Sequence, residues 1–192
     1  GGRRMITKPA RQHAGVVDHV RDGPLQLRPH DRSDQGDHVA VRSGRGVREP
    51  LHDAADPAHL REIASFTYPG AGYTHSAWPD SSGRHLYVCD EQNGQPLRVF
   101  DIARLDQPVL DDVLSPNPQS IVHNPCVLGD ALYLASYTEG VRALDLSDPA
   151  HPAEFGFADS YPGPSGGYAG VWGVCPYYPS GTVIASDMQS GL

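Results

Sequence analysis

Most of the chain beyond residue 73 consists of short apolar runs separated by polar turn sequences. Each run is four to six residues long and rich in Val, Ile, Leu and Tyr, a composition typical of strands. The intervening sequences place Gly or Asn where an antiparallel hairpin needs a positive φ. The runs are HLYVCD at 85–90, LRVFDI at 97–102, ALYLAS at 131–136, VRALDL at 141–146 and TVIASD at 182–187. The pattern predicts an all-β chain of antiparallel strands.

The strands belong to a repeat. The tetrapeptide DPAH occurs at 56–59 and again at 148–151, a separation of 92 residues. An equivalent segment begins at Asp101, between Asp53 and Asp145, and divides this separation into 48 and 44 residues. Four strands in about 46 residues, repeated in tandem, are typical of a β-propeller blade. An immunoglobulin-like sandwich has similar strands but no reason to repeat on this scale, so the propeller is favoured.

This period gives a map of the blades. We expect the outer strand of one blade at 61–68, a whole blade at about 73–114, a second at about 120–160, and the start of a third from about 168. The fold class expected is therefore an all-β propeller fragment of about three four-stranded blades. A closed propeller needs at least four blades, so we expect marginal stability, or self-association in place of the missing blades.

Composition divides the chain near Pro50. Residues 1–50 carry ten Lys or Arg against six Asp or Glu, whereas the whole chain has a net charge of −8, and all fifteen aromatic residues lie in 51–192. We therefore expect 1–50 to be a disordered or non-native basic segment and 51–192 to be the partial propeller. Because acids are interspersed with the bases and aromatic residues are missing, the first segment does not indicate nucleic-acid binding.

The three cysteines and the hydropathy pattern add little functional information. Cys89, Cys126 and Cys175 lie in apolar sequence and form no CxxC pair, so we expect buried thiols. No run of eighteen apolar residues exists, so we expect no membrane span, and no signal-peptide pattern is present.

Three segments carry a resemblance to a known family. They are YTEGVRALDLSDPAHPAEFGFADSYP at 137–162, PYYPSG at 176–181 and SDMQSGL at 186–192. The chain resembles the LVIVD-repeat β-propellers, and specifically the choice-of-anchor B family, over about residues 53–192. The resemblance implies a secreted or surface-anchored protein of around seven blades without an established catalytic activity.

The repeat also aligns residues that could form a site. The first strand of each propeller blade lines the central channel, and His75, His123 and Trp172 share one such position. A metal site there would use His75 and His123 as ligands, since imidazole and carboxylate groups suit divalent metals such as Zn²⁺ or Mn²⁺. The remaining candidates for a ligand-binding site at the channel mouth are Asp90, Glu91, Asn124 and Asp187. A structural role, in which such His side chains join blade to blade, is the favoured interpretation.

Two functional hypotheses follow. No GxSxG elbow, P-loop or GxGxxG motif is present, which favours a binding or scaffold module with a protein or carbohydrate ligand. The resemblance implies that this module is extracellular or lies on the cell surface. The alternative is a metal-dependent hydrolase or oxidoreductase with its site at the channel mouth. The aromatic residues Tyr168, Trp172, Tyr177 and Tyr178 either form a binding platform or fill the core between blades, and the core is favoured. Asp148 and Pro149 of the second DPAH are expected to form a turn.

Overall fold

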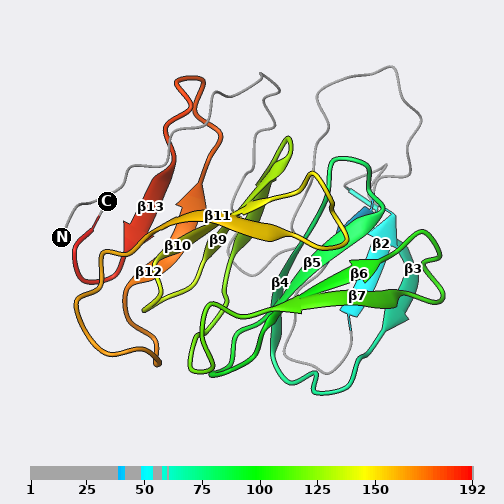
Figure 1. The fold of residues 1–192 in the computed structure, drawn as a ribbon. Coiled ribbons are helices and arrows are strands. Elements are labelled where there is room, and N and C mark those ends of the chain that lie inside the picture. Colours follow the sequence, from blue (N-terminus) through cyan, green and yellow to red (C-terminus); the bar gives the residue numbers. More distant parts are fainter. Residues whose placement is uncertain (1–38, 42–48, 54–57, 60, 192) are drawn as a thin grey trace.

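The computed structural model describes residues 39–41, 49–53, 58–59 and 61–191. Within these ranges it contains thirteen strands and no helix, and the strands form four antiparallel sheets. The prediction of an all-β chain is therefore confirmed for the described residues. Figure 1 shows the sheets following one another in chain order, from the cyan strands to the red ones.

Two sheets are complete four-stranded meanders, in which each strand pairs with the next along the chain. The first contains β4 (Thr74–Pro79), β5 (His85–Asp90), β6 (Leu97–Asp101) and β7 (Val109–Leu114). The second contains β8 (Pro125–Leu128), β9 (Ala131–Ala135), β10 (Val141–Asp145) and β11 (Ala153–Ala158). These bounds lie inside the repeat units expected at 73–114 and 120–160.

The two flanking sheets are smaller. At one side, β12 (Val171–Cys175) pairs with β13 (Ile184–Asp187), and at the other β2 (Glu49–Asp53) lies between β1 (Val39–Val41) and β3 (Arg61–Phe66). The predicted boundary at Pro50 therefore falls inside a strand, and β1 lies within the segment expected to be disordered. Backbone pairing such as that of Leu51 with Ala64 needs no aromatic side chain, which is why composition missed these strands. The rest of that prediction falls outside the described residues.

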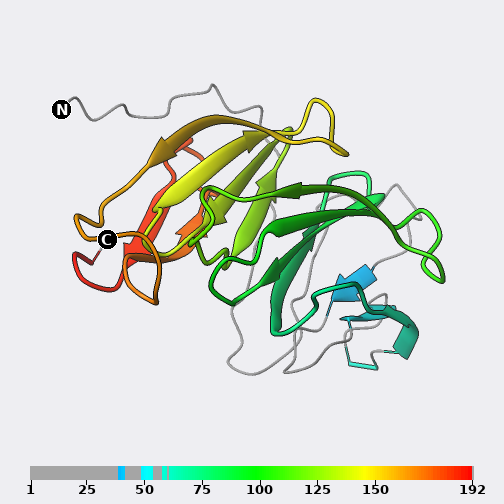
Figure 2. The same cartoon turned by 60° about the horizontal axis from the view of Figure 1, so that its bottom comes forward.

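Neighbouring sheets lie against one another (Figure 2), and clusters of buried apolar side chains join them. The largest cluster joins Tyr87 and Val99 of the first meander to Leu132 and Leu144 of the second, all of them buried. A second cluster joins the sheet of β2 to the first meander, and a third joins the second meander to β12. Each of the two meanders thus packs against the sheets that precede and follow it in the sequence, as in a repeat protein.

The cysteines divide between core and surface. Cys89 and Cys126 are buried, and burial raises the pKa of the Cys126 thiol to about 12. Cys175 is exposed, so the expectation that all three thiols are buried is wrong for this residue. It is the last residue of β12, in a sheet of only two strands, where less of the strand is covered.

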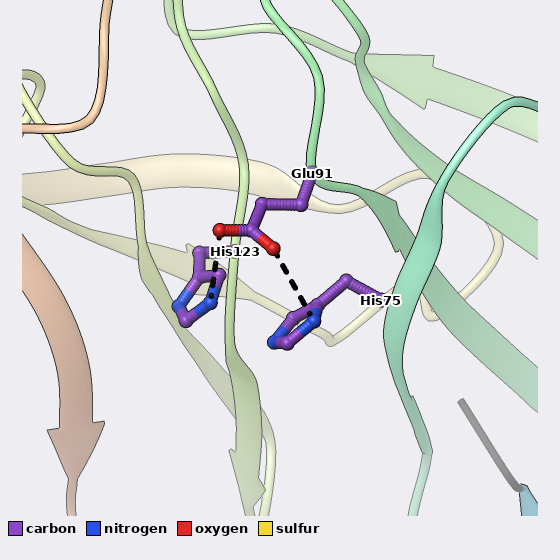
Figure 3. A group of neighbouring side chains, drawn as sticks. All are labelled: His75, Glu91 and His123. Carbon is purple, nitrogen blue, oxygen red and sulfur yellow. Dashed lines mark ion pairs between the residues drawn. The ribbon is translucent and has the colours of Figure 1, made fainter. Parts of the chain in front are cut away.

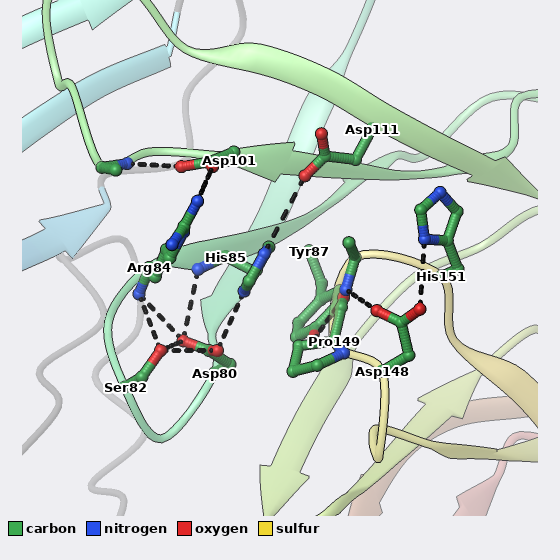
Figure 4. Close-up of polar contacts among 12 residues, drawn as sticks. Asp80, Ser82, Arg84, His85, Tyr87, Asp101, Asp111, Asp148, Pro149 and His151 are labelled. Carbon is green, nitrogen blue, oxygen red and sulfur yellow. Dashed lines mark hydrogen bonds and ion pairs between the residues drawn. The ribbon is translucent and has the colours of Figure 1, made fainter.

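The second DPAH forms the expected turn between β10 and β11 (Figure 4). The Asp148 Oδ1 accepts a hydrogen bond of 3.2 Å from the Ala150 N–H, and the Asp148 carbonyl accepts one of 3.1 Å from the His151 N–H. The Tyr87 hydroxyl donates to the carbonyl of Pro149 at 3.1 Å, which fixes the turn against the preceding sheet. The first copy, at 56–59, lies mostly outside the described residues.

Candidate functional site

Three of the candidate site residues meet where the first and second meanders adjoin (Figure 3). His75 belongs to β4, Glu91 follows β5, and His123 precedes β8. The His75 Nδ1 lies 3.3 Å from the Glu91 Oε2, and the His123 Nε2 lies 3.5 Å from the Glu91 Oε1. The two imidazole rings are stacked, with centroids 4.3 Å apart and an interplanar angle of 13°. We call these three residues the His–Glu–His cluster.

The local backbone explains this placement. The register of β4 against β5 shifts between Thr74 and Ser76, so His75 is the extra residue of a β-bulge, a device that re-aims a side chain. The His123 N–H donates to the carbonyl of Ala135 at 2.9 Å, which holds His123 against the end of β9. The Ser76 hydroxyl donates to the His123 carbonyl and so connects the two meanders directly beside the cluster.

His123 is the buried member of the cluster, with a side chain only 1% exposed. Its Nδ1 lies 2.6 Å from the carbonyl oxygen of Trp172, which also accepts a hydrogen bond of 3.2 Å from the Asn124 Nδ2. Because a carbonyl can only accept, Nδ1 carries the proton in this contact. A neutral His123 therefore has its lone pair on Nε2, the nitrogen that faces Glu91.

Tyr137 completes the surroundings of Glu91. Its hydroxyl donates to the Glu91 Oε1, and its ring centroid lies 4.9 Å from that of His123. Its φ of 45° lies in the left-handed region, a conformation that costs free energy for a non-glycine residue and that clusters at functional sites. Burial raises the pKa of Tyr137, and the hydrogen bond to Glu91 raises it further, so the phenol stays a proton donor.

Tyr137 was not among the predicted site residues. The repeat did contain a signal, because Tyr137 follows Glu91 by 46 residues and occupies the equivalent place after its own strand. Its backbone pairs with Val171 through two hydrogen bonds of 2.9 Å, which also connects the second meander to β12.

An exposed aromatic surface borders the cluster. The Trp172 ring lies 5.5 Å from that of His123 and the Tyr168 ring 5.4 Å from that of Tyr137, while the Trp172 and Tyr168 residues are 42% and 60% exposed. Tyr177 instead stacks on Trp78 at 6.1 Å and is partly buried in the core. The expectation that the aromatic residues fill the core is therefore correct for Tyr177 and wrong for Tyr168, Trp172 and Tyr178.

Asp90 lies apart from the cluster. Its side chain is 0% exposed and forms an ion pair of 3.0 Å with the Arg98 Nη1, while the Tyr68 hydroxyl donates to it at 3.0 Å. Consecutive residues of an extended strand point to opposite sides, so the end of β5 sends Glu91 toward the histidines and Asp90 into the sheet interior. Asp90 has a structural role here.

Asp187 is not a member of the His–Glu–His cluster. It lines a small surface hollow together with Trp172, Ser186 and Met188 at the end of β13. A hydrogen bond of 2.5 Å from the Ser160 hydroxyl lowers the pKa of Asp187. Asn124 and Trp172 adjoin the cluster through the Trp172 carbonyl, whereas Asp187 adjoins Trp172 in this surface hollow.

A second group of titratable residues lies at the opposite end of the first meander (Figure 4). The His85 Nδ1 lies 3.1 Å from the Asp80 Oδ2, and its Nε2 lies 3.9 Å from the Asp111 Oδ2. Asp101 forms an ion pair of 2.8 Å with Arg84. His85 lies between two carboxylates, and Asp101 has a guanidinium partner. These ion pairs join β5, β6 and β7, so we assign this group a structural role.

Comparison of the sequence with models of known protein families and with curated proteins found no match. In the described part of the chain, no helix has the length and apolar character needed to cross a membrane. The function therefore has to be argued from the geometry of the site itself. Two imidazoles, one carboxylate and one phenol can hold a divalent cation or exchange protons, and the neighbouring rings can contact a larger ligand.

Proposed function

We propose that the protein is a β-propeller-type binding or scaffold module whose ligand contacts the His–Glu–His cluster and the aromatic surface beside it. One observation carries the proposal: the three residues that the repeat aligns, His75, His123 and Trp172, lie side by side on successive sheets. Equivalent first-strand positions meet in this way around the channel of a propeller. The resemblance to LVIVD-repeat proteins supports the same architecture and an extracellular or cell-surface location.

The ligand class that fits this surface best is a carbohydrate. Trp172 and Tyr168 are exposed aromatic residues, and Asn124 and His75 add polar groups close to them. Large rigid rings supply contact area at low entropic cost, and a few polar groups fix orientation. A peptide would use the same rings, so a binding test has to compare oligosaccharides with peptides.

The chain contains two tryptophans, which makes fluorescence a direct test. Trp78 is 7% exposed and buried in the core, whereas Trp172 is 42% exposed, so a ligand at the site should change mainly the Trp172 emission. We expect saturable quenching by members of an oligosaccharide panel and none by matched peptides.

Two variants complete this test. Trp172→Ala should abolish the signal and the binding measured by calorimetry. Tyr178→Ala removes a ring that is 49% exposed but lies in the connection between β12 and β13, beyond the other end of β12, so binding should persist. Equal binding by the Trp172→Ala variant, or quenching by peptides alone, would refute the carbohydrate proposal.

The second candidate function is a metal-dependent hydrolase or oxidoreductase. It is supported by the shared carboxylate of Glu91 and by the 29% exposure of the His75 side chain, which leaves one side of the cluster open. The test is hydrolysis of chromogenic carboxylic and phosphate esters by the protein with added Zn²⁺ or Mn²⁺. Turnover that disappears in His75→Ala would favour this function over a purely binding role.

A further inference from the structure

We propose that the His–Glu–His cluster binds one divalent transition-metal ion of the Zn²⁺ class. This inference deepens the proposed function, since it rests on the same recognition site and names the first ligand held there. One donor atom from each of His75, Glu91 and His123 lies within 4.8 Å of the other two. Two imidazole nitrogens and a carboxylate oxygen are a ligand set that Zn²⁺ takes in proteins.

The protonation pattern of His123 is the main argument. Its Nδ1 proton is directed to the Trp172 carbonyl at 2.6 Å, so a neutral ring turns a lone pair on Nε2 toward the Glu91 Oε1, 3.5 Å away. A cation held between the Nε2 and the Glu91 carboxylate would take the place of the proton that otherwise joins them in an ion pair. An Nδ1–H bonded to a backbone carbonyl is also the usual way in which a metal-binding His is oriented for ligation through Nε2.

Glu91 is oriented in a comparable way. Tyr137 donates its hydroxyl to the Glu91 Oε1, and the Tyr168 hydroxyl donates to the Glu91 carbonyl at 3.2 Å, so both the side chain and the backbone of Glu91 are held. Hydrogen bonds from outer residues to ligating carboxylates fix their direction and are a regular part of metal sites. Tyr137 is therefore a positioning residue in this proposal.

His75 provides the entrance to the site. Its side chain is 29% exposed, against 1% for His123 and 14% for Glu91. Because the nitrogen lone pairs of two stacked rings lie in nearly parallel planes and do not meet at one point, we expect the exposed His75 ring to rotate about its side-chain bonds when the ion binds. Three protein ligands would leave a further coordination position open on this side, where an oxygen of a bound ligand could enter.

The test is calorimetric titration of the purified chain with Zn²⁺, repeated with Co²⁺, whose visible spectrum reports nitrogen and oxygen ligation. We expect about one ion per chain. Glu91→Gln and His123→Ala should each weaken binding by more than the roughly 10–100-fold that loss of an outer partner costs. His75→Ala should do the same, and because His75 is partly exposed this variant keeps the test valid if His123→Ala fails to fold.

Two control variants address other sites on the surface. His151→Ala removes an exposed imidazole 3.4 Å from a carboxylate, and His85→Ala removes the histidine of the second titratable group. Both should bind Zn²⁺ like the unmodified chain. Binding that persists in His75→Ala and Glu91→Gln, binding that is lost only in His85→Ala, or no binding of Zn²⁺ at all would overturn the proposal.

The outcomes also separate this inference from the proposed function. Zn²⁺ binding by a chain that shows no saturable fluorescence change with sugars would uphold the metal site and count against the binding module. Sugar binding that continues in the presence of EDTA, together with no binding of Zn²⁺, would uphold the binding module and overturn the metal site.

Discussion

Replacing Asp90 by Asn tests whether the buried ion pair at the end of β5 supports the fold. Asp90 is 0% exposed and the Arg98 side chain 8%, so the variant leaves a guanidinium without its counter-charge in the sheet interior. Removing one partner of a buried pair costs about 3–5 kcal/mol. Arg98 keeps a hydrogen bond of 2.8 Å to the Gln95 Oε1 and its position 4.7 Å from the centroid of the Tyr68 ring, so we expect the lower end, about 3 kcal/mol.

The assay is urea unfolding at neutral pH, followed by circular dichroism and by the fluorescence of the buried Trp78. For a chain of this length a loss of this size lowers the melting temperature by roughly 6–12 °C. The matched control is Asp106→Asn, because Asp106 and Arg104 form a pair of 3.1 Å with side chains that are 68% and 65% exposed. Such a pair is worth about 0–1 kcal/mol.

A double variant measures how strongly Asp90 and Arg98 depend on each other. Asp90→Asn combined with Arg98→Met removes both charges, so the loss should be smaller than the sum of the two single losses. A loss below about 1 kcal/mol for Asp90→Asn, or a strictly additive double variant, would show that the pair contributes no more than an exposed one.

Two further predictions concern a turn and a carboxylate. Gly140 has φ +72°, and a Cβ there would collide with the carbonyl of Ala158, whereas Gly129 has φ +59° with open space around it. Urea unfolding should therefore show that Gly140→Ala lowers the free energy of unfolding by about 1–3 kcal/mol more than Gly129→Ala does. Burial of Asp80 raises its pKa, but hydrogen bonds, foremost from His85, outweigh this and lower the pKa below 3.8. This stabilisation is complete above the unfolded-state pKa and is lost as the pH falls through the folded-state pKa, so the urea midpoints of the wild type and Asp80→Asn should converge on acidification. Equal losses at the two glycines, or a constant gap between the urea midpoints, would contradict these predictions.

The repeat period predicted more of this molecule than any motif did. Spacing alone placed His75, His123 and Trp172 at equivalent positions. In the structure the centroid of the His123 ring lies 4.3 Å from that of His75 and 5.5 Å from that of Trp172. The apolar runs at 85–90 and 97–102 likewise correspond to β5 and β6, and those at 131–136 and 141–146 to β9 and β10, because these inner strands are buried against neighbouring sheets and need nearly continuous hydrophobic residues.

Other parts of the site could not be predicted from the sequence. The sequence does not predict which of Asp90 and Glu91 faces the histidines. That orientation depends on the β-bulge at His75, and no residue type there indicates a bulge. Tyr137 shares the repeat position of Glu91, but its positive φ is imposed by the pairing with Val171 and by the turn to Gly140. Neither feature follows from local propensity.

The spacing of the contacts between sheets has a consequence for how the chain folds. Tyr137 contacts Glu91 across 46 residues, Cys126 contacts Val174 across 48, and His123 contacts Trp172 across 49. Because the entropy of closing a loop grows only with the logarithm of its length, each of these junctions costs nearly the same amount to form. Neither of these two junctions is favoured by proximity, so the second meander can template the docking of its neighbour in either direction along the chain.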